Sequence, residues 1–273
     1  MSGLNIKHRI TESFSQSADR YDQNAAVQRA IGEQLIKDLQ ARQAMVSLDA
    51  QGCWLDLGCG SGYFSEHFAN HFEAQGLALD IAFGMLKHTD QRMPVSAKVS
   101  LLNADAEALP LASESLDLIF SNFALQWCLN LPAALLECWR VLKPGGYCGL
   151  TIPGEGSLKE LQTSWAALDT FDHVNRFYSQ NDLKQVVRQC LPQNVALALS
   201  QQVYVDHHPD LKSLLKSLKS IGANTLTGAS NRGLMGKQRF ACLEENYEKY
   251  RQADGSLPLS YQVLTLIMNK PKP

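Results

Sequence analysis

Apolar residues recur with two different periods along the chain. Before residue 45 they return every three or four positions, which predicts two amphipathic helices. One stripe consists of Ile6, Ile10, Phe14, Ala18 and Tyr21, and the other of Val27, Ile31, Leu35 and Leu39. From residue 53 onward, short apolar runs alternate with helical patterns. These runs predict seven strands, at 53–57, 74–80, 99–102, 116–120, 147–152, 195–206 and 259–268.

Helical patterns fill the stretches between the predicted strands. They cover 61–72, 83–86, 131–142, 157–168, 181–191, 210–222 and 237–251. The run Lys143-Pro144-Gly145-Gly146 is expected to end the helix over 131–142, because proline and glycine stop helices there. Five strands alternating with helices predict a doubly wound parallel sheet with right-handed crossovers. The last two strands are expected to form an antiparallel pair at its edge.

The predicted organisation is one large α/β domain with helical additions, which suits a chain of 273 residues. We expect an N-terminal helical cap over 1–45 and the α/β domain over 46–273. Lid insertions are expected at about 153–193 and 209–252.

A glycine-rich turn follows the first predicted strand. Its pattern is Asp56-x-Gly58-x-Gly60-x-Gly62. Glycine allows the backbone conformations of such a turn and a close approach by a ligand, and the following helix directs free N–H groups toward it. A dinucleotide fingerprint would need its third glycine at Tyr63, and a P-loop would need Lys followed by Ser or Thr after the last glycine. The turn therefore matches neither fingerprint, and its ligand stays open on this pattern alone.

Acidic residues stand at the ends of the next two predicted strands. Asp80 lies about 18 residues beyond the last glycine, where a carboxylate can accept hydrogen bonds from both hydroxyls of a ribose. Asp105 follows the third strand. Neighbours of these acids, Ile81, Met85 and Ala106, are expected to pack near the same ligand.

Composition and charge exclude several classes of function. The formal net charge of −2 argues against a general nucleic-acid binder. No apolar run approaches the ~20 residues that a membrane span needs, the N-terminus has no signal core, and the seven cysteines form no C-x-x-C pair. We expect a cytoplasmic protein without a metal site. One basic stretch, 211–239, contains Lys and Arg and no acidic residue.

The glycine pattern and the two acids together resemble class I S-adenosylmethionine (SAM)-dependent methyltransferases. The resemblance implies a Rossmann-like seven-stranded sheet, with the glycines at the amino-acid end of SAM, Asp80 at its ribose and Asp105 at its adenine amine. It also implies that Tyr21, in an Arg-Tyr-Asp element that breaks the first helix, lies against the cofactor. Asn122 ends the fourth strand as a further cofactor contact. The segment Phe123-Ala124-Leu125 lacks the two prolines of enzymes that methylate bases.

More specific motifs resemble the malonyl-acyl-carrier-protein O-methyltransferases of biotin synthesis. The resemblance covers most of the chain, and three elements discriminate it: Gln126-Trp127-Cys128, Asn175-Arg176-Phe177 and Ile221-Gly222-Ala223. Supporting elements are 20–22, 27–29, 109–111, 121–122, 156–158 and 219–220. The implied reaction is methylation of the free carboxylate of a malonyl thioester.

The implied substrate residues lie in the loop 171–177. Arg176 is expected to anchor the malonyl carboxylate, because a guanidinium pairs with carboxylates through two hydrogen bonds. His173 or Asn175 would orient the carboxylate, and Trp127 or Trp165 would wall the pocket. An acyl carrier protein is expected on a basic surface that consists of Lys212, Lys216, Lys219, Arg232 and Arg239.

Two other functions stay open on the sequence alone. The protein could methylate a quinone carbon or another small acid, because the first half of the chain fits many small-molecule methyltransferases. It could also be a non-catalytic SAM-binding interaction module, since fold does not determine function. The choice between a carrier protein and coenzyme A also stays open.

Overall fold

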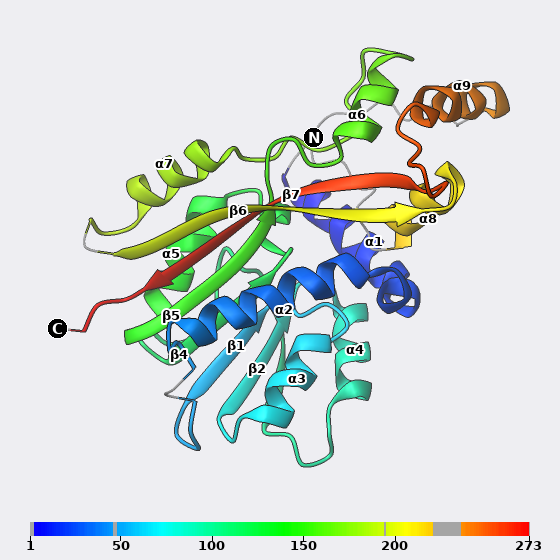
Figure 1. Cartoon of the computed structure of the whole chain (residues 1–273). Coiled ribbons are helices and arrows are strands. Elements are labelled where there is room, and N and C mark those ends of the chain that lie inside the picture. The colour runs from blue at the N-terminus through cyan, green and yellow to red at the C-terminus, as the bar shows by residue number, and fades with distance from the viewer. Residues whose placement is uncertain (1–2, 46–47, 194, 221–235, 273) are drawn as a thin grey trace.

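All seven predicted strands are present and form one mixed sheet (Figure 1). The structure is a computed structural model, and it describes residues 3–45, 48–193, 195–220 and 236–272. The strands are β1 (Cys53–Leu57), β2 (Gln75–Asp80), β3 (Val99–Asn103), β4 (Leu116–Asn122), β5 (Leu142–Pro153), β6 (Ala196–His208) and β7 (Leu257–Asn269). Their order across the sheet is β3-β2-β1-β4-β5-β7-β6.

One strand near the edge of the sheet, β7, runs opposite to the others. Strands β1 to β5 pair in parallel, while β7 runs antiparallel to both β5 and β6. The predicted doubly wound sheet with an antiparallel edge is therefore confirmed. Because the five parallel strands share one direction, their carboxyl ends meet at one edge, where ligands of such sheets bind.

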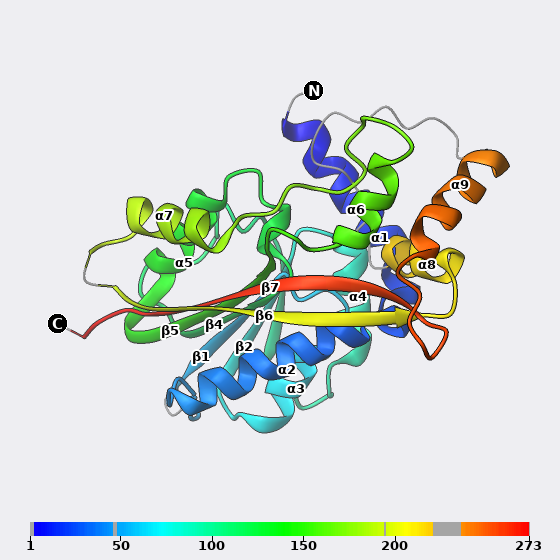
Figure 2. The ribbon, with the colours of Figure 1, turned by 45° about the horizontal axis from the view of Figure 1, so that its top comes forward.

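Helices cover both faces of the sheet (Figure 2). They are α1 (Gly3–Asn24), α2 (Ala26–Ala41), α3 (Tyr63–His71), α4 (Phe83–Arg92), α5 (Leu131–Val141), α6 (Lys159–Ala166), α7 (Gln180–Cys190), α8 (Leu211–Ser220) and α9 (Lys237–Glu248), with a short 3-10 turn, η1 (Leu125–Trp127). On one face, Leu39 of α2 and Phe68 of α3 share a buried cluster with Trp54. On the other face, Leu135 of α5 and Leu183 of α7 pack in the cluster of the sheet.

A separate cluster forms beyond the carboxyl ends of the parallel strands. There β6 and β7 extend past the rest of the sheet toward α6, α8 and α9 (Figure 1). Leu161, Leu214, Leu243 and Leu259 are buried together in it. A buried carboxylate, Glu160, ties α6 to β7 by accepting hydrogen bonds from Ser260 Oγ at 2.5 Å and Ser260 N at 3.1 Å. Both lid segments are therefore joined to β7.

One local prediction was wrong. The first helix continues through Tyr21 to Asn24, because nothing in Arg20-Tyr21-Asp22 removes a helical hydrogen bond. The predicted end of the helix over 131–142 is confirmed, because α5 ends at Val141. The run 143–146 then lies inside β5, which begins earlier than expected, and it forms an irregularity: β4 pairs Leu116 with Leu142 and then Leu118 with Tyr147. The predicted end of the helix over 210–222 lies outside the described residues.

The two N-terminal helices lie at different places on the sheet. Helix α2 packs on the sheet through Leu35 and Leu39, whereas α1 lies at the carboxyl ends of the parallel strands. The domain boundary at residue 45 stays a prediction. None of the helices in the described ranges is long and apolar enough to cross a lipid bilayer.

Candidate active site

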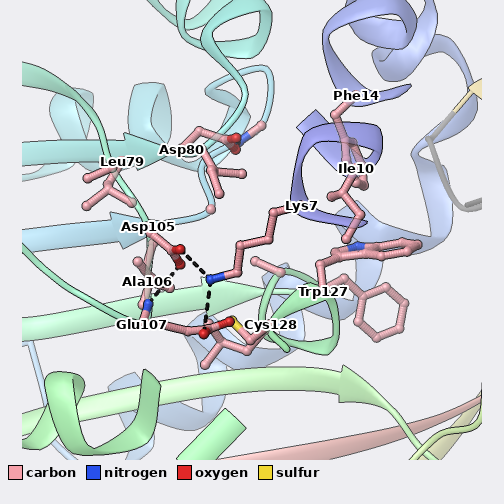
Figure 3. A pocket seen from close by; sticks show the side chains of 18 of the residues that line it. Lys7, Ile10, Phe14, Leu79, Asp80, Asp105, Ala106, Glu107, Trp127 and Cys128 are labelled. Carbon is pink, nitrogen blue, oxygen red and sulfur yellow. Dashed lines mark hydrogen bonds and ion pairs between the residues drawn. The ribbon is translucent and has the colours of Figure 1, made fainter. Parts of the chain in front are cut away.

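A cavity opens where the carboxyl ends of β1, β2, β3 and β4 meet the side chains of α1 (Figure 3). Its empty volume is about 750 Å³, including its open mouth. Eight of the predicted cofactor residues line it, namely Tyr21, Gly58, Gly60, Asp80, Ile81, Asp105, Ala106 and Asn122, and the predicted wall residue Trp127 lines it too. The fold thus brings together side chains that are up to 106 positions apart in the sequence.

The glycine turn is held in a left-handed conformation beside this cavity. Gly58, Gly60 and Gly62 have φ values of 75°, 56° and 82°. A Cβ on Gly58 would lie 2.2 Å from that of Ala124, and one on Gly62 would lie 2.7 Å from the side chain of Thr89. Glycine is therefore required at both positions. Gly60 borders the cavity, whereas Gly62 packs the turn against α4 and does not line it.

Asp80 joins the end of β2 to the glycine turn. Its Oδ2 accepts a hydrogen bond from Gly60 N at 2.9 Å, and its Oδ1 accepts one from Ala82 N at 2.7 Å. Burial raises the pKa of this carboxyl to about 6, although the backbone N–H donors oppose the shift. Each oxygen keeps a second acceptor site, so the carboxylate can receive the two hydroxyls of a ribose.

Asp56, in β1 just before the glycine turn, is bonded to the helix that follows the turn. Its side chain is buried and accepts a hydrogen bond from Ser65 Oγ at 2.6 Å. Burial raises the pKa of this carboxyl to about 7. Asp56 does not line the large cavity, but it borders a smaller one described below.

Asp105 is engaged by a cation from the N-terminal helix. Lys7 of α1 forms an ion pair with Asp105 and a second one, at 3.0 Å, with Glu107 (Figure 3). Among the described residues that line the large cavity, Lys7 alone is cationic. An adenine amine that reached Asp105 would therefore share this carboxylate with Lys7.

The apolar stripe of α1 forms another wall of the cavity. Ile10, Phe14 and Tyr21 all line it. The ring of Phe14 meets Trp127 edge-on, with centroids 5.3 Å apart (Figure 3). The neighbouring Asp22 accepts a hydrogen bond from Ser61 Oγ at 2.5 Å, which attaches α1 to the glycine turn.

A smaller cavity of about 400 Å³ adjoins the first on the other side of the turn. The two cavities share Tyr21, Gly58, Gly60 and Asn122 as lining residues. Asn122 is fixed between them, because its Nδ2 donates to Gln28 O at 2.9 Å and its Oδ1 accepts from Thr151 Oγ1 at 2.7 Å. The two cavities are therefore neighbours at the glycine turn.

The structure does not bring every predicted residue to these cavities. Met85 is fully buried in a cluster with Ala18 and Ala82, where it packs α4 against α1. Arg176 has a side chain that is 89% exposed and forms an ion pair with Asp172 at 3.6 Å. Asn175 and His173 also lie outside the residues that line either cavity.

His173 and Trp165 instead belong to a cluster inside the lid. Their rings stack with centroids 3.9 Å apart and an interplanar angle of 12°. Asp169 Oδ1 lies 2.9 Å from His173 Nε2, and Asp169 also pairs with Arg239 of α9. The guanidinium of Arg239 lies over the indole of Trp165 at 5.5 Å. This cluster joins the two lid insertions to each other.

Sequence reasoning missed several lining residues. They include Lys7, Glu107, Phe123, Ala124, Leu125 and Cys128 around the large cavity, and Gln28 and Arg29 around the small one. Phe123, Ala124 and Leu125 come directly after β4 in the sequence, so the predicted end of that strand could have indicated them. The described residues contain no group of three or more His, Cys, Asp or Glu side chains that could hold a metal ion.

Known proteins resemble this chain in sequence and fold. A family model for methyltransferase domains matches residues 55–150. Malonyl-[acyl-carrier protein] O-methyltransferase of Methylococcus capsulatus is 37% identical over 97% of this chain and 94% of that protein. The biotin biosynthesis bifunctional protein BioHC of Cellvibrio japonicus is 38% identical over 97% of this chain, which spans only 50% of that relative.

A solved structure with the same fold is the YcgJ protein of Bacillus subtilis. Its TM-score is 0.54 at 17% identity, and the match covers 86% of this chain and 97% of that one. At this identity the likeness shows the fold alone. The sequence relationship is much closer, because it extends along nearly the whole of both proteins. This chain therefore belongs to the family of malonyl-[acyl-carrier protein] O-methyltransferases.

Proposed function

We propose that the protein transfers a methyl group from SAM to the free carboxylate of a malonyl thioester. The product would be the malonyl methyl ester that starts the synthesis of the pimelate part of biotin. One observation carries the proposal: in a chain of this family, the glycine turn, Asp80 and Asp105 converge on a single cavity at the sheet edge. The malonyl substrate is inferred from the relatives, which are malonyl-[acyl-carrier protein] O-methyltransferases.

The chemistry of the residues that line the cavity supports SAM as the ligand. Gly58 and Gly60 leave room for a ligand beside the turn, Asp80 can accept from the ribose hydroxyls, and Asp105 can accept from the adenine amine. Ile81 and Ala106 supply apolar surface for the adenine ring. The bound sulfonium would supply an activated methyl group, and the buried carboxylates nearby favour a positively charged ligand.

The transfer needs little acid–base chemistry from the protein. A malonyl carboxylate, with a carboxyl pKa of about 4, is already ionised at neutral pH, so no general base has to create the nucleophile. Its oxygen must lie in line with the methyl carbon and the sulfur, with water excluded. Such orientation can contribute ~7–11 kcal/mol to lowering a barrier. Trp127 and Phe14, which lie edge-on beside the cavity, can exclude water there.

The anchor of the substrate carboxylate is part of the proposal. Arg176 would take this role when substrate binds, with Asn175 or His173 orienting the carboxylate. The guanidinium is exposed, and its ion pair with Asp172 is long, so most of its N–H donors can pair with a substrate carboxylate. The role requires the loop 167–179 to approach the cavity, so the lid would close over the bound malonyl group.

The partner would be an acyl carrier protein, docked on the basic face of α8. Lys212, Lys216 and Lys219 are exposed there, on the side opposite the buried Leu211, Leu214 and Leu218. Helix α8 packs against α1, which borders the cavity. Arg239 forms an ion pair with Asp169, so the proposed surface consists of the lysines of α8. Arg232 lies outside the described residues. We also propose a cytoplasmic location.

A panel of thioesters tests the function. Methyl transfer from labelled SAM is measured with malonyl-, succinyl- and acetyl-carrier protein, with malonyl-CoA, and with quinones and small acids. We expect transfer to malonyl thioesters, weaker transfer to succinyl and none to acetyl, which has no free carboxylate. Efficient methylation of a quinone would favour the alternative of a carbon methyltransferase. Failure to bind SAM would favour a non-catalytic module.

A further inference from the structure

Gln28 carries a buried polar atom that has no hydrogen-bond partner among the described residues. The residue is only 7% exposed, and its Oε1 has no hydrogen-bond partner within the part of the chain that the structure describes. Leaving a buried acceptor unpaired is unfavourable for folding, so native proteins do so rarely. The backbone carbonyl of the same residue is bonded to Asn122. The main-chain oxygen of Gln28 is therefore satisfied, and the unpaired oxygen is the one in its side chain.

The position of Gln28 connects it to the proposed cofactor site. It lies in the first turn of α2 and lines the smaller cavity, which adjoins the larger one at the glycine turn. If adenosine occupies the end near Asp80 and Asp105, the other end of the same ligand must pass Gly58 and Gly60. That end reaches the cavity bordered by Gln28.

The smaller cavity combines groups that suit a zwitterion. Asp56 and the oxygen of Gln28 are acceptors for a cation, and Arg29 supplies positive charge for an anion. Arg29 Nη1 donates to Asp22 O at 2.7 Å, and its guanidinium lies 5.5 Å from the centre of the Tyr63 ring, so it is held in place. Its remaining N–H groups can pair with a carboxylate.

We propose that Gln28 and Arg29 recognise the amino-acid end of SAM: Gln28 Oε1 accepts a hydrogen bond from the α-ammonium, and Arg29 pairs with the α-carboxylate. This inference rests on the proposed function for the identity of the ligand. The methionine part of the cofactor would thus be recognised by Gln28 and Arg29, and its nucleoside part by Asp80 and Asp105. The unpaired oxygen of Gln28 becomes satisfied only when that part is bound.

The test compares ligands with and without the amino-acid end. Affinities for SAM, S-adenosylhomocysteine and 5′-methylthioadenosine are measured by calorimetry for the wild-type protein, Gln28→Met and the matched control Gln40→Met, whose glutamine is exposed on the same helix. For Gln28→Met we expect a loss of about tenfold or more for the first two ligands and a change below about twofold for methylthioadenosine. Gln40→Met should bind all three like the wild type.

A second readout excludes a merely structural role. Removing an unpaired buried oxygen should leave the melting temperature of the ligand-free Gln28→Met protein unchanged or higher, while its rise on adding SAM becomes smaller. Equal losses for all three ligands, or unchanged affinity for SAM, would overturn the role of Gln28. If the wild-type protein bound none of the ligands, the proposed function would fail as well, which separates the two outcomes.

Discussion

Lys7 forms an ion pair with Asp105, 98 residues further along the chain, and so attaches the N-terminal helix to the end of β3. Glu107 completes the arrangement at 3.0 Å from the same ammonium. The pairs are partly buried, which weakens their screening by salt. Helix α1 thus lines the cavity, and it also forms an ion pair with Asp105, the carboxylate that is proposed to bind adenine.

Replacing Lys7 by Met should loosen this helix. Without the ammonium, two neighbouring carboxylates lose their partner and α1 loses its long-range ion pairs. We expect amide hydrogen exchange within 3–24 to become about fivefold faster in the ligand-free protein, which corresponds to ~1 kcal/mol. Lys37→Met, at an exposed position of α2, is the control. Unchanged protection of α1 would show that the ion pairs do not hold it.

Binding of SAM should strengthen as the pH rises from 5 to 7.5. Burial raises the pKa of Asp80 to about 6 and that of Asp56 to about 7, so at pH 5 both carboxyls hold protons. A cationic ligand favours their ionised forms, and binding at low pH must therefore release protons. We expect an increase in affinity of about tenfold or more over this range, measured by calorimetry at constant ionic strength.

The variant Asp80→Asn gives the control for this pH dependence. It cannot ionise at position 80, so its weaker affinity should vary less with pH below 7. The pH dependence of the free energy of unfolding without SAM has the opposite sign. Protonation of carboxyls with raised pKa values stabilises the fold at pH 4, and this contribution is lost as the pH rises through 6 and 7. An affinity for SAM that fell as the pH increased would contradict the assignment of these carboxylates.

Arg176→Ala should impair methyl transfer without affecting the cofactor. Loss of a paired guanidinium is expected to lower kcat/KM for the malonyl substrate by about a hundredfold. The affinity for SAM should stay unchanged, because Arg176 lies outside both cavities in the ligand-free protein. Arg188→Ala, at an exposed position on α7, serves as the control in the same lid segment. Normal transfer by Arg176→Ala would remove this residue from the mechanism.

The lysines of α8 should matter only for a carrier-bound substrate. The double change Lys212→Glu and Lys216→Glu is expected to raise KM for malonyl-carrier protein by about tenfold at low salt, since it reverses the charge of the docking face. KM for a malonyl ester of a small thiol should not change. The double change Lys184→Glu and Arg188→Glu, at exposed positions of α7, is the charge-matched control. An equal rise for both substrates would place the effect in the catalytic centre instead.

Much of this site could be predicted because its signals are local. A glycine turn after a strand and an acid at a strand end each depend on neighbouring residues, and Gly58, Asp80 and Asp105 meet at one cavity for that reason. Partnerships between distant side chains carry no such signal. The pairing of Lys7 with Asp105 joins two segments far apart in the chain, and nothing in the local pattern around Lys7 specifies it.

The lid illustrates the same difference. The composition of 171–177 indicates a loop with chemically active side chains, but it does not tell which of them pair within the lid. His173 stacks on Trp165 and is hydrogen-bonded to Asp169, which in turn binds Arg239 from another insertion. Arg239, which was predicted for the docking surface, is thus paired within the lid, whereas Arg176 is exposed.

The most direct test of the central claim locates the transferred methyl group. Malonyl-carrier protein is incubated with methyl-labelled SAM and the wild-type protein, the mass of the intact carrier is measured, and labelled methanol is assayed after alkaline hydrolysis of ester and thioester. We predict that the carrier gains one methyl group and that alkali releases this group as methanol, as it does from a methyl ester of the malonyl carboxyl. A carrier that gains no mass under conditions in which the protein binds SAM, or a methyl group that survives hydrolysis, would contradict the account.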